Sequence, residues 1–250
     1  MPEFPIKKSF KGKEPIFDEM RHLYLDQKTR APYYNVTRWL SKFKPEFDFD
    51  AMSEVYAKKY NMQVDKVREM WNKKRDDSVI FGKKFHKVFE EYLISSSIIE
   101  EDYKPVVEQF NCLNLVDRKH HNFFEKRLYN SDLNIAGTAD IISINGDTFD
   151  IYDFKTNKKL GFENSFKQDK WLKSPLDHLP NSEYFNYALQ LSMYAYLTEQ
   201  MTGLRCNRLR IFWYNRHQPE NYDSLQGRWQ IYTVPYLKEE IKACINELSQ

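Results

Sequence analysis

Apolar positions recur along this chain with two periods, and the two periods predict its elements. Alternation of apolar and polar residues between turn residues favours β-strands. It predicts strands at about residues 121–129, 133–144, 147–155, 207–214 and 228–234. Apolar residues spaced three and four apart favour amphipathic helices. They predict helices at about residues 36–43, 50–60, 63–95 (one helix or a pair), 102–118, 183–202 and from Pro235 onward.

Single residues define several of these helices more closely. We expect Thr37 to cap the first helix and Pro45 to close it, because a hydroxyl can accept from a free N–H group and proline cannot continue a helix. Gly203 follows the helix at 183–202, where a glycine commonly takes the left-handed conformation. In the second part of the helical segment 63–95, one apolar stripe should face the core. Its members are Phe81, Phe85, Val88 and Tyr92.

The order of elements is helices, three strands, a helix, two strands and a helix. Such an order fits an α/β (α+β) fold with a central mixed sheet and helices on both faces. We expect residues 1–62 to form a basic arm with short helices, packed on a core of residues 63–250. Prolines at positions 2, 5, 15 and 32 argue against a long helix at the start of the arm.

Composition limits the classes that the chain can belong to. With 250 residues, 41% of them hydrophobic, it can bury one good core. No apolar run approaches the roughly 18–20 residues of a membrane span, and the first 30 residues mix acidic and basic side chains, unlike a targeting peptide. These features predict a cytoplasmic protein without a membrane partner. Its three cysteines are too scattered for a zinc or iron–sulfur site.

Charge is distributed unevenly along the chain. Residues 1–89 hold 20 Lys and Arg against 13 Asp and Glu, whereas residues 90–250 hold 18 against 23. Each half taken alone is compatible with an ordinary solvated surface. Together, a basic half beside an acidic site is what a metal-dependent enzyme that acts on a polyanion requires.

Two predicted strands meet at Asn145-Gly146, a dipeptide that favours a tight hairpin. If Ile144 pairs with Asp147, Asp140 and Asp153 become diagonal neighbours on one face, at a backbone distance of roughly 7–8 Å. Lys155 points to the same face, since side chains alternate along a strand. Like charges side by side destabilise a sheet, and a divalent cation between them would relieve this.

The helix that precedes the sheet presents a second set of polar residues. Gly82, His86 and Glu90 are spaced four apart and so share one face. A small residue there would let another element approach, and the imidazole and the carboxylate would offer two metal ligands. A solvated surface histidine is the alternative interpretation.

These residues occur in an order that resembles a known family. The blocks are Gly82-x-x-x-His86-x-x-x-Glu90, Glu125, Gly137-Thr138-Ala139-Asp140, Asp153-Phe154-Lys155-Thr156 and Gln190-x-x-x-Tyr194. Their order and spacing resemble the motif set of the PD-(D/E)xK nuclease superfamily, and most closely its RecB-like exonuclease branch. The resemblance covers about residues 80–200 and implies a restriction-endonuclease-like core. One departure is Ala139, which stands where the family motif has proline.

The resemblance implies a role for each matching residue. Asp140, Asp153, the backbone carbonyl of Phe154 and His86 would hold one or two Mg²⁺ or Mn²⁺ ions, and Lys155 would orient the attacking water. Beside a cation, the pKa of Lys155 would fall far enough to help deprotonate that water. The ion would polarise the phosphoryl group and stabilise the leaving oxygen.

The remaining matched residues have supporting roles with alternatives. Glu90 would orient His86 or lie exposed, and Glu125 would support the metal site or face solvent. Gln190 and Tyr194 would hold the DNA strand or Lys155. The alternative for Tyr194 is a place in the apolar core among the aromatic residues of its helix.

Basic and aromatic residues outside these motifs are candidates for DNA contact. They are Arg38, Trp39, Lys42, Lys83 and Lys84. Lysine and arginine can neutralise phosphates, and a tryptophan among them can stack on an unpaired base. Each of them alone is also compatible with an ordinary surface.

The sequence therefore predicts a metal-dependent DNA exonuclease that acts in recombination, repair or phage DNA processing. Its substrate would be single- or double-stranded DNA with ends, and a recombination or single-strand-binding protein could recruit it. No phosphate-binding loop of the nucleotide hydrolases occurs, so no nucleotide cofactor is expected. The alternatives are a structure-selective endonuclease on the same site and an inactive nucleic-acid-binding protein.

Overall fold

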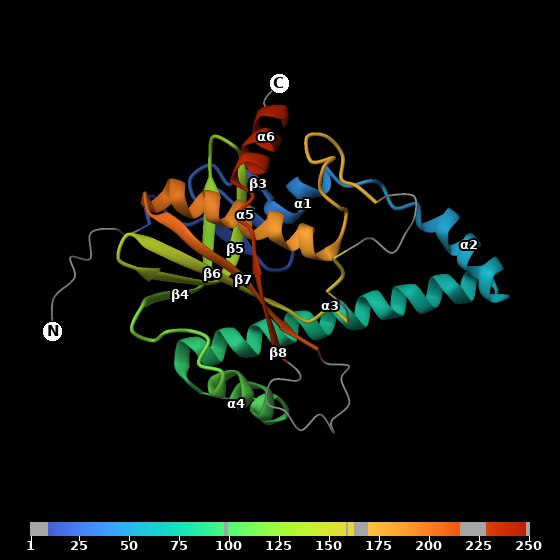
Figure 1. Cartoon of the computed structure of the whole chain (residues 1–250), viewed down its shortest axis with the longest axis horizontal. Coiled ribbons are helices and arrows are strands. Elements are labelled where there is room, and N and C mark those ends of the chain that lie inside the picture. Colours follow the sequence, from blue (N-terminus) through green and yellow to red (C-terminus); the bar gives the residue numbers. More distant parts are fainter. Residues whose placement is uncertain (1–9, 98–99, 159, 163–169, 216–228, 249–250) are drawn as a thin grey trace.

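The structure is a computed structural model that describes residues 10–97, 100–158, 160–162, 170–215 and 229–248. A mixed sheet of eight strands lies between helices, which confirms the predicted fold class (Figure 1). The strands are β1 Ile16–Asp18, β2 Leu23–Leu25, β3 Pro32–Asn35, β4 His121–Asn130, β5 Ile135–Asn145, β6 Thr148–Lys155, β7 Arg205–Tyr214 and β8 Trp229–Val234. The helices are α1 Val36–Ser41, α2 Phe49–Tyr60, α3 Val64–Ser95, α4 Lys104–Cys112, α5 Glu183–Thr202 and α6 Lys238–Leu248, with a 3-10 turn at Glu101–Tyr103.

Helices cover both faces of the sheet because its central strands are apolar on both sides. Ile141 and Tyr152 face the core that α3 and α4 complete. Their chain neighbours Ile142 and Ile151 face the core that α1, α5 and α6 complete. Strands covered on both faces need apolar residues at successive positions, which explains the pairs Ile141-Ile142 in β5 and Ile151-Tyr152 in β6.

The sheet has an opening beside β5. β4 pairs along one edge of β5 from Ile135 to Ile144. The other edge is shared by two strands, because β3 pairs with Ile135 and Ala136 in parallel and β6 pairs with residues 141–145. Between these two stretches, residues 137–140 form no ladder on that edge in the part of the chain that the structure describes. We call this stretch the β5 gap.

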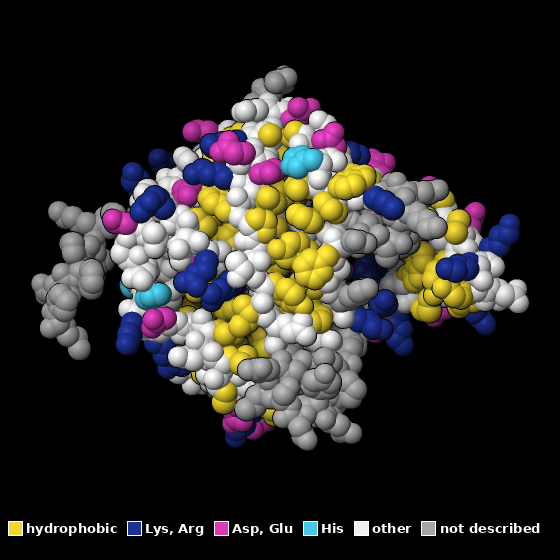
Figure 2. Space-filling model, viewed as in Figure 1, with side chains coloured by type: hydrophobic (Ala, Val, Ile, Leu, Met, Phe, Trp, Pro, Cys, Tyr) yellow, Lys and Arg dark blue, Asp and Glu magenta, His cyan; other side chains and the backbone are white. Residues whose placement is uncertain are grey.

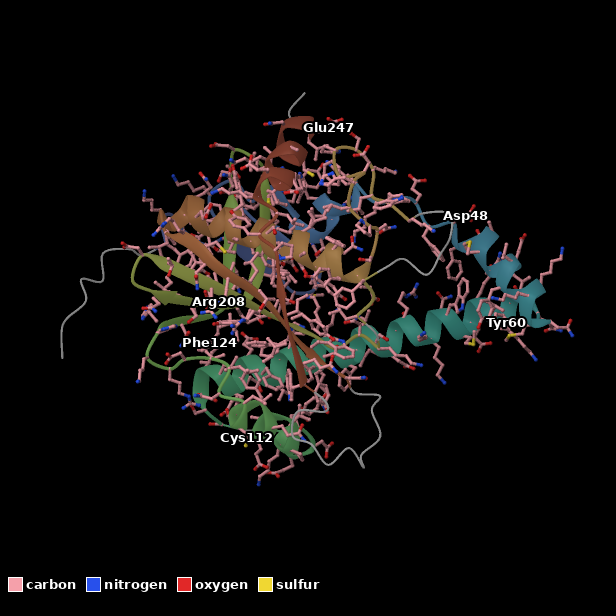
Figure 3. All side chains as sticks on the ribbon, in the orientation of Figure 1. Asp48, Tyr60, Cys112, Phe124, Arg208 and Glu247 are labelled. Atoms are coloured by element: carbon pink, nitrogen blue, oxygen red, sulfur yellow. The ribbon has the colours of Figure 1, made fainter. Side chains whose placement is uncertain are left out.

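α3 is a single helix of 32 residues, about 48 Å long. The predicted stripe is confirmed: Phe85, Val88 and Tyr92 are buried, and Phe81 packs against their cluster. The N-terminal half of α3 extends beyond the sheet and carries α2 (Figure 1). Asp48 and Tyr60, at the two ends of α2, lie far from the sheet (Figure 3).

Two predicted helix starts are wrong for tertiary reasons. α1 is capped by Asn35 rather than Thr37, because the chain leaves β3 in an extended conformation and the Asn35 side chain accepts from the Arg38 N–H group at 2.7 Å. α6 begins at Lys238 rather than at Pro235. Ser192 of α5 holds the intervening residues, since its hydroxyl accepts from the Leu237 N–H group at 2.9 Å.

Other predicted features agree or fall partly outside the described residues. Gly203 follows α5 with a φ of +72°, as expected. The long connection at residues 158–182 is described only in part, and its described residues contain one isolated bridge between Trp171 and Pro180. Among the described helices, none combines the length and the apolar character that crossing a membrane requires.

Candidate metal and catalytic site

The candidate site forms where β5 and β6 separate. Their ladder ends at the pair Ile141 and Tyr152, while β6 continues along β7 as far as Lys155. One step beyond the last pair, Asp140 comes opposite Asp153. The carboxylate of Asp140 turns into the β5 gap and accepts from the Phe154 N–H group at 2.7 Å. The separation of the strands thus gives a buried carboxylate room at the centre of the sheet.

The predicted hairpin register is wrong by two residues. Asn145 pairs with Thr148, so Gly146 and Asp147 are the central residues of the turn rather than Asn145 and Gly146. Gly146 has a φ of +61° and Asp147 has no positive φ, as in a turn that places glycine first. A shift of two residues leaves every side chain on its face. Asp140 and Asp153 therefore still converge, and they are closer than a diagonal pair.

α3 delivers His86 to the gap. Its Nδ1 atom lies 3.3 Å from Oδ2 of Asp140. Burial alone would lower the pKa of His86, but the charge and hydrogen bond of Asp140 raise it to about 9. Burial would likewise raise the pKa of Asp140, yet His86 holds it below its usual range. In the metal-free protein a proton thus lies where an imidazole would otherwise bind a cation.

Glu125 completes a potential ligand set from β4. Its φ is +46°, rare for a residue other than glycine inside a strand, and the β4–β5 ladder is interrupted at this position. Burial and the charge of Asp140 raise the pKa of Glu125 to about 8. One ligand atom from each of His86, Glu125 and Asp140 lies within 4.8 Å of the others. Strain and a raised pKa at one side chain are typical of functional sites.

Asp153 and Lys155 form an ion pair beside this trio. Burial raises the pKa of Asp153 to about 6, and Asp140 contributes to the rise. Burial would lower the pKa of Lys155, but Asp153 and Asp140 raise it above its usual range. The lower pKa expected beside a cation stays a prediction. Lys155 Nζ also lies 4.8 Å from the centre of the Tyr187 ring, a contact that the sequence analysis missed.

α5 closes the gap from the other face. Gln190 donates to the Tyr194 hydroxyl at 3.1 Å, and Tyr194 is 5% exposed, so its ring lies in the core as well as beside the site. A Cβ atom on Gly137 would lie 2.7 Å from the Tyr194 ring, so only glycine fits there without a shift. A cavity of about 450 Å³ opens next to these residues, with Tyr24 and Arg38 also in its wall.

The other predicted site residues lie in varied surroundings. Glu90 is half-buried one turn beyond His86, and burial raises its pKa. The Phe154 side chain belongs to the apolar cluster under α3. Gly82 lies beside Thr156: a Cβ atom added at this glycine would lie 3.7 Å from the Thr156 Oγ1 atom. An added Cβ would make an ordinary van der Waals contact, so the helix and the end of β6 are neighbours but their spacing does not require glycine.

The predicted DNA contacts divide into surface and core residues. Trp39 is 4% exposed and packs on Phe43, so its ring is enclosed and the stacking role expected of it is wrong. The neighbouring ring on the surface is Tyr34, 43% exposed, with Arg38 and Lys42 both over it at 5.9 and 5.0 Å.

Two lysines of α3 were predicted to contact DNA as well. Lys83 is exposed. Lys84 is paired with Glu100 at 2.9 Å, so a phosphate would have to compete with that carboxylate for its charge.

The donor set indicates which ion the site suits. Two carboxylates and one imidazole, with a further carboxylate at Asp153, match the preference of Mg²⁺ and Mn²⁺ for oxygen ligands, and the imidazole favours Mn²⁺. A divalent cation can take the place of the protons that these buried or half-buried groups hold, and it would neutralise their carboxylates. The site can therefore hold a divalent cation next to a fixed ammonium group.

Comparison with known proteins adds a distant structural similarity. No family model matches the chain, and no curated protein does. Among solved structures, a phage-related exonuclease from Haemophilus somnus 129PT matches with a TM-score of 0.34 and 17% identity, over 67% of this chain and 77% of that chain. Similarity this low leaves the function to be argued from the geometry of the site.

Proposed function

We propose that the chain is a divalent-metal-dependent nuclease that hydrolyses phosphodiester bonds of DNA. One observation carries the proposal: the His86, Glu125 and Asp140 ligand atoms lie within 4.8 Å of one another, beside the Asp153–Lys155 ion pair. One helix (α3) and three strands (β4, β5 and β6) contribute to this cluster, so it is a product of the fold rather than of one local turn. A buried set of this kind without a cation has a high cost in desolvation and repulsion.

In this proposal His86, Glu125 and Asp140 hold the cation, and Asp153 either completes its shell or holds a second one. A divalent cation in such a site polarises the phosphoryl oxygen and lowers the pKa of water. The Phe154 N–H group fixes the carboxylate of Asp140 between His86 and Glu125 on one side and the Asp153–Lys155 pair on the other. The fixed geometry means that little rearrangement precedes the reaction.

Lys155 supplies the positive charge that the protein itself contributes. Because the neighbouring carboxylates raise its pKa, the amine is protonated and donates rather than accepts. It would orient the attacking water and stabilise negative charge that develops on the phosphoryl oxygens. The Tyr187 ring and Asp153 restrict where the amine can lie. No covalent intermediate is required.

We further propose that the enzyme acts from DNA ends, in recombination, repair or phage DNA processing. This finer proposal rests on the motif resemblance, together with the basic N-terminal half of the chain. An endonuclease would use the same site residues, so the substrate decides between the two. End-labelled linear DNA and covalently closed circles, each incubated with Mn²⁺ or Mg²⁺, separate them: an exonuclease degrades the first and leaves the second intact.

Activity is tested with matched pairs of variants. Asp153→Asn and Lys155→Ala should each lower the rate about a hundredfold or more, since each removes a charge at the reacting group. Asp150→Asn is the control for the first, because Asp150 is also buried on β6 and accepts from the Tyr152 hydroxyl at 3.1 Å. Lys238→Ala is the control for the second, because Lys238 also pairs with a carboxylate, that of Glu199 at 2.6 Å, but lies outside the site.

Two outcomes would count against the enzyme. The first is no metal-dependent loss of DNA by the wild-type chain, which would favour an inactive nucleic-acid-binding protein. The second is an equal loss of activity in each variant and its control, which would mean that folding rather than chemistry was measured.

A further inference from the structure

Aromatic side chains extend over the surface from the candidate site to the outer strand of the sheet. They begin at Tyr187, which covers Lys155, and continue with Tyr184 one turn earlier on α5. The Phe162 ring lies 4.7 Å from Tyr184 and 5.9 Å from Tyr232 of β8. We call these four residues the aromatic track. Figure 2 shows hydrophobic side chains gathered on this face, over α5 and β8.

The track is held in place by contacts other than those of its exposed rings. The Tyr184 N–H group donates to the Gly161 carbonyl at 3.1 Å, and the Tyr184 hydroxyl donates to the Thr233 carbonyl at 3.2 Å. These bonds fix the start of α5 to both neighbouring segments. Phe162 nevertheless remains 50% exposed. A half-exposed aromatic ring on a fixed support leaves one surface available to a ligand.

Exposed lysines in the neighbouring chain segments favour an anionic ligand with flat apolar parts. Lys158 and Lys170 are exposed in the chain segments that flank Phe162 and α5, and Trp171, next to Lys170, is 54% exposed. The acid nearby, Glu183, already accepts from the Asn157 side chain at 2.8 Å. Exposed lysines in the segments next to a row of rings match a strand whose phosphates and bases both bind.

We propose that the aromatic track binds the unpaired bases of single-stranded DNA on their way to or from the site at Lys155. In a duplex the faces of the bases are covered by their own stack, so only an unpaired strand can use the rings. The proposal rests on the proposed nuclease function for the purpose of the track, and it narrows the substrate to one with a single-stranded segment. A second protein that covers the track is the competing occupant.

The test is binding without digestion, by fluorescence anisotropy of labelled oligonucleotides with the wild-type chain in EDTA. Three probes of equal length are compared: a thymidine single strand, a duplex and a strand of abasic sites. Phe162→Ala should weaken binding of the thymidine strand about tenfold, the effect of one lost stacking contact. Binding of the duplex and the abasic strand should change less than twofold, because neither offers a free base.

Two further variants separate a lost ring from a damaged fold. Phe162→Trp keeps an aromatic surface and should bind the thymidine strand as the wild type does. Tyr60→Ala removes a ring that is 53% exposed on α2, far from the track, and should have no effect (Figure 3). Equal weakening by Phe162→Ala and Tyr60→Ala would overturn the proposal.

The proposal is also overturned if the wild type does not bind the thymidine strand, or if Phe162→Ala weakens the abasic strand equally. A protein partner would then be the remaining occupant. The nuclease proposal fails separately. If the wild type digests DNA but Phe162→Ala binds the thymidine strand as the wild type does, the track proposal alone fails. If binding depends on the bases but no digestion occurs, the nuclease proposal alone fails.

Discussion

Binding of a divalent cation should release protons from the site. In the metal-free protein the pKa of His86 is about 9 and that of Glu125 about 8, so both groups are largely protonated at pH 7.5. A histidine and a carboxylate must lose these protons to become ligands. Each group therefore carries most of a proton at this pH, and binding should release between one and two protons per site.

Calorimetry measures this number directly. Mn²⁺ is titrated into metal-free protein at pH 7.5 in buffers whose ionisation enthalpies differ, and the slope of observed against buffer enthalpy is the number of protons released. Glu125→Gln should reduce the release to about one proton, since only His86 still loses one. Asp150→Asn, which changes a buried carboxylate of β6 outside the gap, should leave the slope as in the wild type.

A slope near zero with clear binding would refute the assignment, because the cation would then bind somewhere other than at these two groups. An unchanged slope in Glu125→Gln would refute the role of Glu125 alone. In that outcome His86 and Asp140 would remain as the ligand pair.

Three other predictions follow from the same geometry. Metal-free stability should fall as pH rises from about 5 to 8, because the folded protein raises the pKa of Glu125 from 4.5 to about 8 and so penalises its charged form. In urea unfolding with EDTA, Glu125→Gln should raise the free energy of unfolding by on the order of 3 kcal/mol more at pH 8 than at pH 5. An equal gain at both pH values would contradict this. Gly137→Ala should cost about 1–3 kcal/mol, since its Cβ would lie 2.7 Å from the Tyr194 ring, whereas Gly82→Ala should be neutral or stabilising; equal unfolding midpoints would show the close approach to be wrong. In the nuclease assay Tyr187→Phe should retain the kcat of the wild type, whereas Tyr187→Leu should lower kcat about tenfold, and similar kcat values for both would exclude a contact between ring and amine.

Much of the fold could be predicted because it depends on local patterns. β5 and β6 carry apolar residues on both faces between turn residues, and α3 has a stripe at helical spacing, so their types and approximate bounds follow from the sequence alone. The convergence of Asp140, Asp153 and Lys155 was also predictable, even with an incorrect register. Side chains alternate with a period of two, and an error of two residues therefore changes no face.

Features that depend on distant segments could not be predicted. Trp39 lies among basic residues in a short helix, a pattern that does not distinguish a buried ring from an exposed one. Glu125 has its positive φ where the β4–β5 ladder is interrupted and where α3 brings His86 near, and neither feature is marked in the sequence around it. Tyr187 is one of several aromatic residues on α5, and nothing local marks it as the ring that meets Lys155.

The sequence by itself determined the period of each element, the fold class and the face on which each polar residue of the hairpin lies. Short-range sterics and apolar periodicity are sufficient for these features. The tertiary structure alone decided that β3 and β6 share one edge of β5 and leave a gap between them. In that gap His86 of α3 meets the carboxylate of Asp140, while Glu125 reaches it from β4 on the other edge of β5. Only contacts between segments far apart in the chain can hold buried charges so close together.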